Sequence, residues 1–202
     1  MQKKATRIVF FGDSITRMGV DLKGYITMIQ KHLYDTGNTK IELLEAGVGG
    51  DKIYDLYLRV GKDVLEKKPD RVVVFEGVND VRHKTIGTGM DLIKYEKFYR
   101  AVIIKLQEQV SELILVTPAC IGELKNGANP QDEDLELYCD VIRRLAIEYQ
   151  LRLLDFRKRV LEYGAIHNEQ NAASGLLTTD QVHLSDSGNQ LLADELIDIL
   201  EL

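Results

Sequence analysis

The stretch Ile8-Val9-Phe10-Phe11-Gly12-Asp13-Ser14-Ile15-Thr16 decides the fold of this 202-residue chain. Four consecutive apolar residues lead directly into a glycine and two small polar residues. A short, continuous apolar run of this kind is typical of a strand that is buried on both faces of a sheet. The Gly-Asp-Ser sequence that follows is typical of a turn. The stretch therefore predicts a buried strand that brings Ser14 to its carboxyl end.

Four further short segments have the same apolar character: residues 41–44, 72–75, 113–116 and 151–154. Between and after these segments, apolar residues recur at helical spacing over residues 25–33, 53–64, 99–106, 135–149 and 191–200. Alternation of strands and helices with ~30 or more residues per repeat is the βαβ pattern, which implies a parallel sheet with helices on both faces. We therefore predict an α/β chain with three layers and a five-stranded parallel sheet, folded as a single domain over residues 1–202.

The composition argues against several classes of protein. The chain has 26 Lys and Arg against 32 Asp and Glu, a net charge of −6, whereas a nucleic-acid-binding protein needs a basic face. No apolar run approaches the ~18 residues of a membrane span. The basic N-terminus precedes only four apolar residues, 8–11, which are too few for a signal peptide. The sequence therefore predicts a cytoplasmic location, with no nucleic acid as partner and no membrane span.

Three glycine-containing motifs follow the first three predicted strands: residues 12–14 (Gly-Asp-Ser), 47–51 (Gly-Val-Gly-Gly-Asp) and 77–80 (Gly-Val-Asn-Asp). The carboxyl ends of parallel strands meet at one edge of a sheet, where open α/β folds bind their ligands. A fourth motif, Asp180-Gln-Val-His183, precedes the last predicted helix, which Ser185 can cap. We expect the four motifs to meet at that edge.

The residue types in these motifs are those that acyl transfer requires. The hydroxyl of Ser14 is a weak nucleophile unless a base takes its proton. His183 can be that base, with Asp180 three residues earlier to orient its ring. The main-chain N–H groups of Ser14 and Gly50 and the side-chain amide of Asn79 are candidate donors to the oxyanion of a tetrahedral intermediate.

Each motif alone is also typical of an ordinary turn or helix cap. The chain contains only five serines, however, so at its composition a Gly-Asp-Ser tripeptide is expected only about 0.03 times by chance. The motifs also occur together, each at the end of a predicted strand or before a predicted helix. Their combination favours one shared catalytic site over separate turns.

From residue 8 to about residue 195, the chain resembles the GDSL, or SGNH, hydrolases, a family of lipases, esterases and acylhydrolases. Its four motifs match the family's four blocks. The resemblance implies a flavodoxin-like three-layer fold with Ser14 as nucleophile, Asp180 and His183 as orienting acid and base, and Ser14, Gly50 and Asn79 as oxyanion donors. It also implies hydrolysis of a carboxylic ester through an acyl-enzyme, with no cofactor and no metal. One departure is Glu45, where the family often has Asn.

Two non-catalytic interpretations remain open at this point. A flavodoxin-like sheet with glycine-rich strand ends can bind a phosphate or a nucleotide. Alternatively, Asp13, Asp51 and Asp80 can form the metal or phosphoacceptor cluster of a receiver-type module, with Lys158 as a candidate counterpart.

As partner we expect a small-molecule ester. Short-chain acyl esters, acetylated sugars, lysophospholipids and thioesters are all candidates. The segments 81–91 and 119–129 follow predicted strands and are expected to line the acyl pocket, with His83 as a candidate contact. The sequence leaves open which ester is the substrate and whether the chain forms a homo-oligomer.

Overall fold

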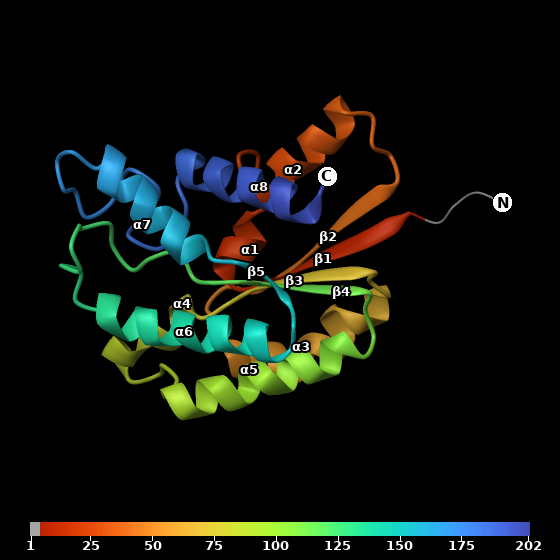
Figure 1. The fold of residues 1–202 in the computed structure, drawn as a ribbon, viewed down its shortest axis with the longest axis horizontal. Coiled ribbons are helices and arrows are strands. Elements are labelled where there is room, and N and C mark those ends of the chain that lie inside the picture. Colours follow the sequence, from red (N-terminus) through yellow and green to blue (C-terminus); the bar gives the residue numbers. More distant parts are fainter. Residues whose placement is uncertain (1–4) are drawn as a thin grey trace.

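The computed structural model describes residues 5–202 as a parallel five-stranded sheet with helices on both faces (Figure 1). The strand order is β2-β1-β3-β4-β5, and every neighbouring pair is parallel. The bounds are β1 Thr6–Gly12, β2 Ile41–Gly47, β3 Arg71–Phe75, β4 Glu112–Val116 and β5 Arg152–Leu154. The five strands and their parallel arrangement confirm the prediction from the apolar runs.

The helices form two layers, one on each side of the sheet (Figure 1). One layer contains α1 Ser14–Met18, α2 Tyr25–Asp35, α7 Phe156–His167 and α8 Asp186–Leu200. The other contains α3 Ile53–Asp63, α4 Val78–Arg82, α5 Leu92–Gln107 and α6 Asp132–Glu148. Short 3₁₀ helices, η1 Leu65–Lys67 and η2 His83–Ile86, follow α3 and α4. The three-layer prediction is therefore confirmed.

Two parts of this arrangement differ from the sequence prediction. Helix α7 was not predicted, because only Phe156, Arg157 and Val160 are buried along its length and they form no sustained apolar stripe. The segment 81–91, expected to be a loop, begins with the end of α4 and then forms η2. Residues 1–4, part of the basic N-terminus used to predict the location, lie outside the described residues.

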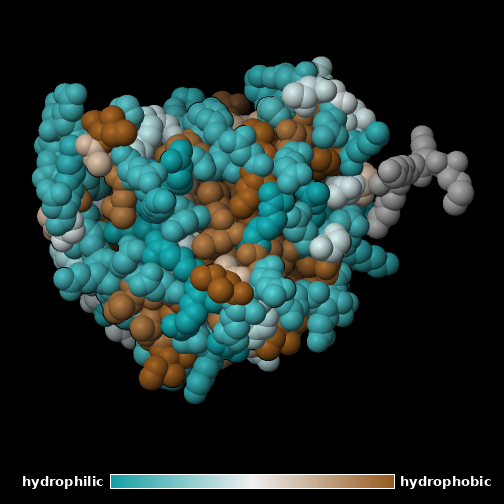
Figure 2. Space-filling view, in the orientation of Figure 1, coloured by the Kyte–Doolittle hydropathy of each residue, from teal (hydrophilic) through white to brown (hydrophobic). Residues whose placement is uncertain are grey.

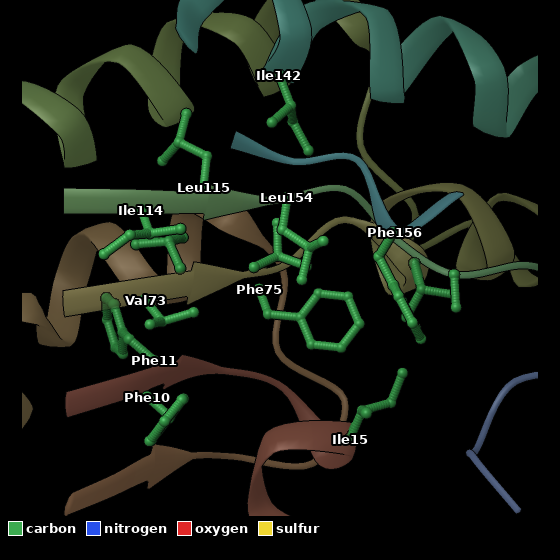
Figure 3. Close-up of a cluster of buried hydrophobic side chains, with 14 of the residues drawn as sticks. Phe10, Phe11, Ile15, Val73, Phe75, Ile114, Leu115, Ile142, Leu154 and Phe156 are labelled. Carbon is green, nitrogen blue, oxygen red and sulfur yellow. The ribbon is translucent and has the colours of Figure 1, made fainter. Parts of the chain in front are cut away.

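The core lies on both faces of the sheet. Ile8, Val9, Phe10 and Phe11 are all fully buried, as the continuous apolar run predicted. Side chains of β3, β4 and β5 pack with α6 and the start of α7 in the cluster of Figure 3. There the Phe75 and Phe156 rings meet edge to face, with centroids 6.1 Å apart and planes at 87°.

The face in Figure 2 is largely hydrophilic, with hydrophobic side chains gathered between the two helix layers. Among the helices of residues 5–202, none is both long enough and apolar enough to cross a bilayer.

Strand register places the first three motifs side by side. Gly12 of β1 lies opposite Gly47 of β2 and opposite Phe75 of β3. The first two motifs begin at these paired glycines, and the third begins at Gly77, two residues after Phe75. Side chains from all three therefore reach the same edge of the sheet, as predicted.

Candidate active site

Ser14 is the first residue of α1 and directly follows the short turn after β1. Asp13 caps this helix, since its Oδ1 accepts the Ile15 N–H at 2.8 Å. A Cβ on Gly12 would lie 2.2 Å from the carbonyl oxygen of Phe75, so only glycine fits where β1 ends beside β3. The strand, the cap and this close approach together fix the position of the serine.

The structure brings the predicted serine, histidine and aspartate into one chain of hydrogen bonds. Ser14 Oγ lies 2.9 Å from His183 Nε2, although 169 residues separate them in sequence. His183 Nδ1 lies 2.7 Å from Asp180 Oδ2. Asp180 Oδ1 also accepts the main-chain N–H groups of Val182 and His183, at 3.1 and 2.8 Å. The acid is therefore fixed to the same turn as the ring that it contacts.

Two opposing effects act on the pKa of Asp180. Partial burial raises it, while hydrogen bonds from the His183 ring and from the main chain of His183 and Val182 lower it. The lowering effects win, so the pKa of Asp180 lies below its ordinary value and the group is ionised at neutral pH. A carboxylate at Nδ1 favours the tautomer that carries its proton there, which leaves Nε2 able to accept the Ser14 hydroxyl.

Two main-chain N–H groups can face a substrate beside the serine. Gly50 has a φ of +84°, which favours glycine, and no atom lies within 4 Å of a Cβ built on it. A Cβ built on the preceding Gly49 would lie 3.8 Å from Ser14 Cβ, so this turn is next to the serine. Within residues 5–202, neither the Ser14 N–H nor the Gly50 N–H donates a hydrogen bond. Both are free to donate to a ligand.

Asn79 lies near the start of α4 and is buried. Its Nδ2 donates to Asp13 Oδ2 at 3.3 Å and to the main-chain oxygen of Asp51 at 3.0 Å. The amide is therefore beside the residue that precedes Ser14, but both of its hydrogens already have acceptors. The contact with Asp13 is the longer one, so a charged oxygen of a ligand would replace it more easily than the contact with Asp51.

Three buried carboxyl groups accompany the site: Asp13, Asp80 and Glu76, each at most 2% exposed. Burial raises the pKa of Asp13 and of Asp80 to about 7, against main-chain hydrogen bonds that lower it. Burial and the charges of the other two groups raise the pKa of Glu76 well above its ordinary value. These groups therefore keep protons at pH values where surface carboxyl groups have lost them.

The second glycine motif is anchored by Arg59 of α3, which sequence reasoning missed. Its Nε donates to Asp51 Oδ2 at 2.6 Å, its Nη1 to the Ala46 oxygen at 2.9 Å, and its Nη2 to the Gly12 oxygen at 2.7 Å. One guanidinium thus joins the ends of β1 and β2 to the turn that contains Gly50. The only signal in the sequence is that Arg59 lies about two helical turns beyond Asp51.

Glu45, which stands where the family often has Asn, forms hydrogen bonds within the turn after β2. Its Oε1 accepts the Gly47 N–H at 2.5 Å, and its main-chain oxygen accepts a hydrogen bond from Lys67 Nζ at 2.8 Å. The glutamate is therefore part of the turn rather than a disruption of it.

Basic side chains border the turn of residues 47–51, here called the glycine turn. Arg17 is exposed, and its Nε and Nη2 lie 3.7 and 3.8 Å from the position of a Cβ on Gly49. Lys52 is buried, and its Nζ donates to the Gly50 oxygen at 3.3 Å. Burial and then the charge of Lys52 lower the pKa of His83, whose contact with substrate stays a prediction.

The remaining candidates from the sequence lie in other surroundings. His32 of α2 contacts the main-chain oxygen of the C-terminal residue at 3.2 Å, and His167 ends α7. Lys158, the counterpart required by the receiver-type interpretation, pairs with Glu162 of its own helix at 3.8 Å. Asp51 is occupied by its ion pair with Arg59. The structure therefore does not bring Lys158 into the site.

Comparisons with known proteins agree with this geometry. The sequence model of the GDSL-like Lipase/Acylhydrolase family matches residues 10–191. The chain is 50% identical to the acetyl xylan esterase AlAXEase, with a TM-score of 0.95 over 96% of this chain and 99% of that one. It is 26% identical to an acetylxylan esterase of Geobacillus stearothermophilus, over 93% of this chain and 90% of that protein. It is 25% identical to the uncharacterized lipoprotein YqeF of Bacillus subtilis (strain 168), over 95% of this chain and 88% of that protein. As the motifs predicted, the chain belongs to the GDSL-like lipase/acylhydrolase family and is a serine hydrolase that acts on ester bonds.

Proposed function

We propose that this enzyme removes acetyl groups from acetylated xylan fragments, with Ser14, His183 and Asp180 as its catalytic triad. The observation that carries the catalytic part of this proposal is the continuous hydrogen-bond chain from Ser14 Oγ through the His183 ring to Asp180, with links of 2.9 and 2.7 Å. A nucleophile, a base and an orienting acid at these distances are what acyl transfer through an acyl-enzyme requires.

The chemistry takes two similar steps. His183 Nε2 accepts the proton of Ser14 Oγ as that oxygen bonds to the acetyl carbon, and the carbonyl electron pair moves onto its oxygen. When the carbonyl re-forms, the ester C–O bond breaks and His183 gives its proton to the departing sugar oxygen. Water then attacks the acetyl-serine with His183 again as base, which releases acetate and restores Ser14. Asp180 stabilises the charged imidazolium in both steps.

In the tetrahedral intermediates, the negative oxygen needs donors that are already in position. The Ser14 and Gly50 N–H groups can donate directly, because each is unoccupied within residues 5–202. Asn79 becomes the third donor when the oxyanion displaces its 3.3 Å contact with Asp13. Its shorter bond to the main-chain oxygen of Asp51 remains and keeps the amide oriented.

An acetylated carbohydrate is the substrate class that the comparisons favour. The protein that is 50% identical over nearly the whole chain is an acetyl xylan esterase, as is the Geobacillus relative. The surroundings of the glycine turn are compatible with a polar leaving group. The exposed Arg17 guanidinium beside Gly49 offers hydrogen-bond donors that sugar hydroxyl groups can accept.

The test compares acetate release from acetylated xylooligosaccharides with hydrolysis of p-nitrophenyl esters of increasing acyl length. We expect turnover of the acetylated sugar and a fall in kcat/KM as the acyl chain lengthens beyond acetyl. Ser14→Ala should abolish turnover of both substrate types. Ser111→Ala is the matched control, because Ser111 lies before β4 and its hydroxyl bonds, among residues 5–202, only to the Asp70 oxygen.

Two results would contradict different parts of the proposal. Near-full esterase activity in Ser14→Ala would refute the triad. Activity that rises with acyl length, together with no release of acetate from the sugar, would refute the carbohydrate substrate and leave the triad intact.

A further inference from the structure

The carboxylate of Glu123, in the segment between β4 and α6, binds a run of three consecutive main-chain N–H groups. It accepts hydrogen bonds from Leu176 N at 3.1 Å, from Leu177 N at 3.1 and 3.2 Å, and from Thr178 N at 2.5 Å. It also accepts the hydroxyl of Thr178, whose side chain is fully buried. An ionised carboxylate that meets four donors at once is a strong and highly directional contact.

The segment that Glu123 binds leads directly to the catalytic turn. Thr178 pairs with Leu184 as an antiparallel bridge, and the Thr179 N–H donates to the His183 oxygen at 2.8 Å. This closes a hairpin over residues 178–184 that carries both Asp180 and His183. A shift of residues 176–178 would therefore move the imidazole relative to Ser14.

The segment 119–129 makes two further main-chain contacts with the same region. The Gly122 N–H donates to the Gln181 oxygen at 2.8 Å, and the Glu123 N–H donates to the Ala173 oxygen at 2.9 Å. Gln181 lies between the acid and the base and has a φ of +78°. A non-glycine residue in this conformation needs surrounding contacts to maintain it, and Gly122 supplies one of them.

The segment 119–129 is itself firmly anchored. Asn129 Oδ1 accepts the Leu124 N–H at 3.1 Å, and Asn129 Nδ2 donates to Asp132 Oδ2 at 2.8 Å. Asp132 in turn forms a buried ion pair with Arg157 of α7 at 2.8 Å. Because α6 and α7 belong to opposite layers, Glu123 extends from a segment that is connected to both.

Other contacts also hold residues 176–178. Leu177 and Thr178 are buried, and the Ser185 N–H and hydroxyl donate to the Leu177 and Leu176 oxygens at 2.8 and 2.9 Å. A cavity of about 390 Å³ lies between residues 122–127 and α7, and Glu123, Leu176 and Leu177 line it. The Ser185 bonds engage main-chain oxygens, whereas within residues 5–202 the three N–H groups of residues 176–178 donate to Glu123 alone.

We propose that Glu123 is a positioning residue of this esterase. By fixing residues 176–178, it holds the His183 ring at hydrogen-bond distance from Ser14 Oγ. This rests on the proposed triad. It also gives the segment 119–129 a role different from the acyl-pocket lining expected from the sequence. Glu123 acts through the hairpin and needs no contact with substrate, so its loss lowers kcat and leaves KM unchanged.

The experiment compares wild type, Glu123→Gln, Asp91→Ala and Ser14→Ala with p-nitrophenyl acetate, well below their melting temperatures. The amide of Glu123→Gln directs an NH₂ group at main-chain donors, so the hairpin loses its fixed position. A displacement of about 1 Å at the reacting atoms lowers kcat by about 10²-fold. We expect that loss with an unchanged KM, and a shifted or broadened low-field proton resonance of the His183–Asp180 bond.

Asp91→Ala, which removes a helix cap, is the matched control for a purely structural effect. Asp91 caps α5 and accepts the Lys94 N–H at 3.0 Å, in the layer opposite α7. It should lower the melting temperature without changing kcat or the low-field resonance. If Glu123→Gln does not fold, Thr178→Val replaces it. That variant removes only the hydroxyl donor to Glu123 and should lower kcat several-fold at unchanged KM.

Each outcome decides one claim. Suppose that Ser14→Ala is inactive, and that Glu123→Gln has the wild-type kcat and an unshifted resonance. This result overturns the role of Glu123 and leaves the proposed function standing. The same result in Thr178→Val overturns it if Glu123→Gln cannot be made. An active Ser14→Ala overturns the proposed function, and the inference that rests on it.

Discussion

Asp13 makes the stability of this enzyme depend on pH in a direction opposite to that of most carboxyl groups. Burial raises its pKa from 3.8 to about 7, against the opposing effects of the Ile15 N–H and the charge of His183. The folded state therefore binds this proton more tightly than the unfolded state does. The contribution to stability is fully present below the unfolded pKa of 3.8 and is lost as the pH rises to about 7.

The magnitude follows from the size of this shift. Each pKa unit corresponds to about 1.4 kcal/mol, so ionised Asp13 lowers the free energy of unfolding by about 4 kcal/mol relative to its protonated form. About 2 kcal/mol of this change falls between pH 5.5 and pH 8.5. Asp13→Asn removes the titration but keeps an oxygen that can accept the Ile15 N–H, since Asn is as good an N-cap as Asp.

Urea unfolding of wild type and Asp13→Asn at pH 5.5, 7.0 and 8.5 measures the effect. From pH 5.5 to pH 8.5, the free energy of unfolding of the variant should rise by about 2 kcal/mol relative to that of wild type. Asp80 and Glu76 are present in both proteins, but the charge of Asp13 contributes to their raised pKa values. The difference between the proteins therefore measures Asp13 together with its coupling to these two groups. A difference between the two proteins that stays constant from pH 5.5 to 8.5 would refute this account of Asp13.

Three further substitutions probe other parts of the structure. Asp180→Asn should lower kcat for p-nitrophenyl acetate by about 10³–10⁴-fold at similar KM, because the imidazole loses the charge that orients it; a loss under tenfold would argue against an orienting role. Asn79→Ala should lower kcat by about 10²–10³-fold, and a change confined to KM would indicate a role in substrate binding instead. Arg157→Met breaks the buried pair with Asp132 and should lower the free energy of unfolding by about 3–5 kcal/mol in urea titrations; a neutral effect would show that Asp132 finds another partner.

The parts of the fold that depend on local sequence could be predicted. The strands were predictable because strands buried on both faces are continuous apolar runs, as in Ile8–Phe11. The meeting of the glycine motifs was predictable because parallel strands end at one edge, and the register places Gly12 level with Gly47 and Phe75. Helix α7 could not be predicted, because few of its residues are buried in the core. The single-domain organisation, the cytoplasmic location and any homo-oligomer stay predictions.

Contacts that depend on packing could not be predicted. Glu123 meets Leu176–Thr178 more than 50 residues away, and Arg59 meets Gly12 across 47 residues. No periodicity or short motif records such pairs. The protonation of Asp13 follows from its burial, which only the folded chain establishes. The sequence could thus name the residues of the candidate triad, but not the distant groups, such as Glu123, that hold the segments carrying them.

The central claim is that His183 activates Ser14 as a nucleophile, and covalent labelling tests it most directly. Wild type, Ser14→Ala and His183→Ala are treated with a fluorophosphonate, and the modified residue is found by peptide mass mapping. The account predicts one label per wild-type chain, on Ser14, and none in either variant. Labelling of wild type at another residue, or labelling of Ser14 that persists undiminished in His183→Ala, would contradict it.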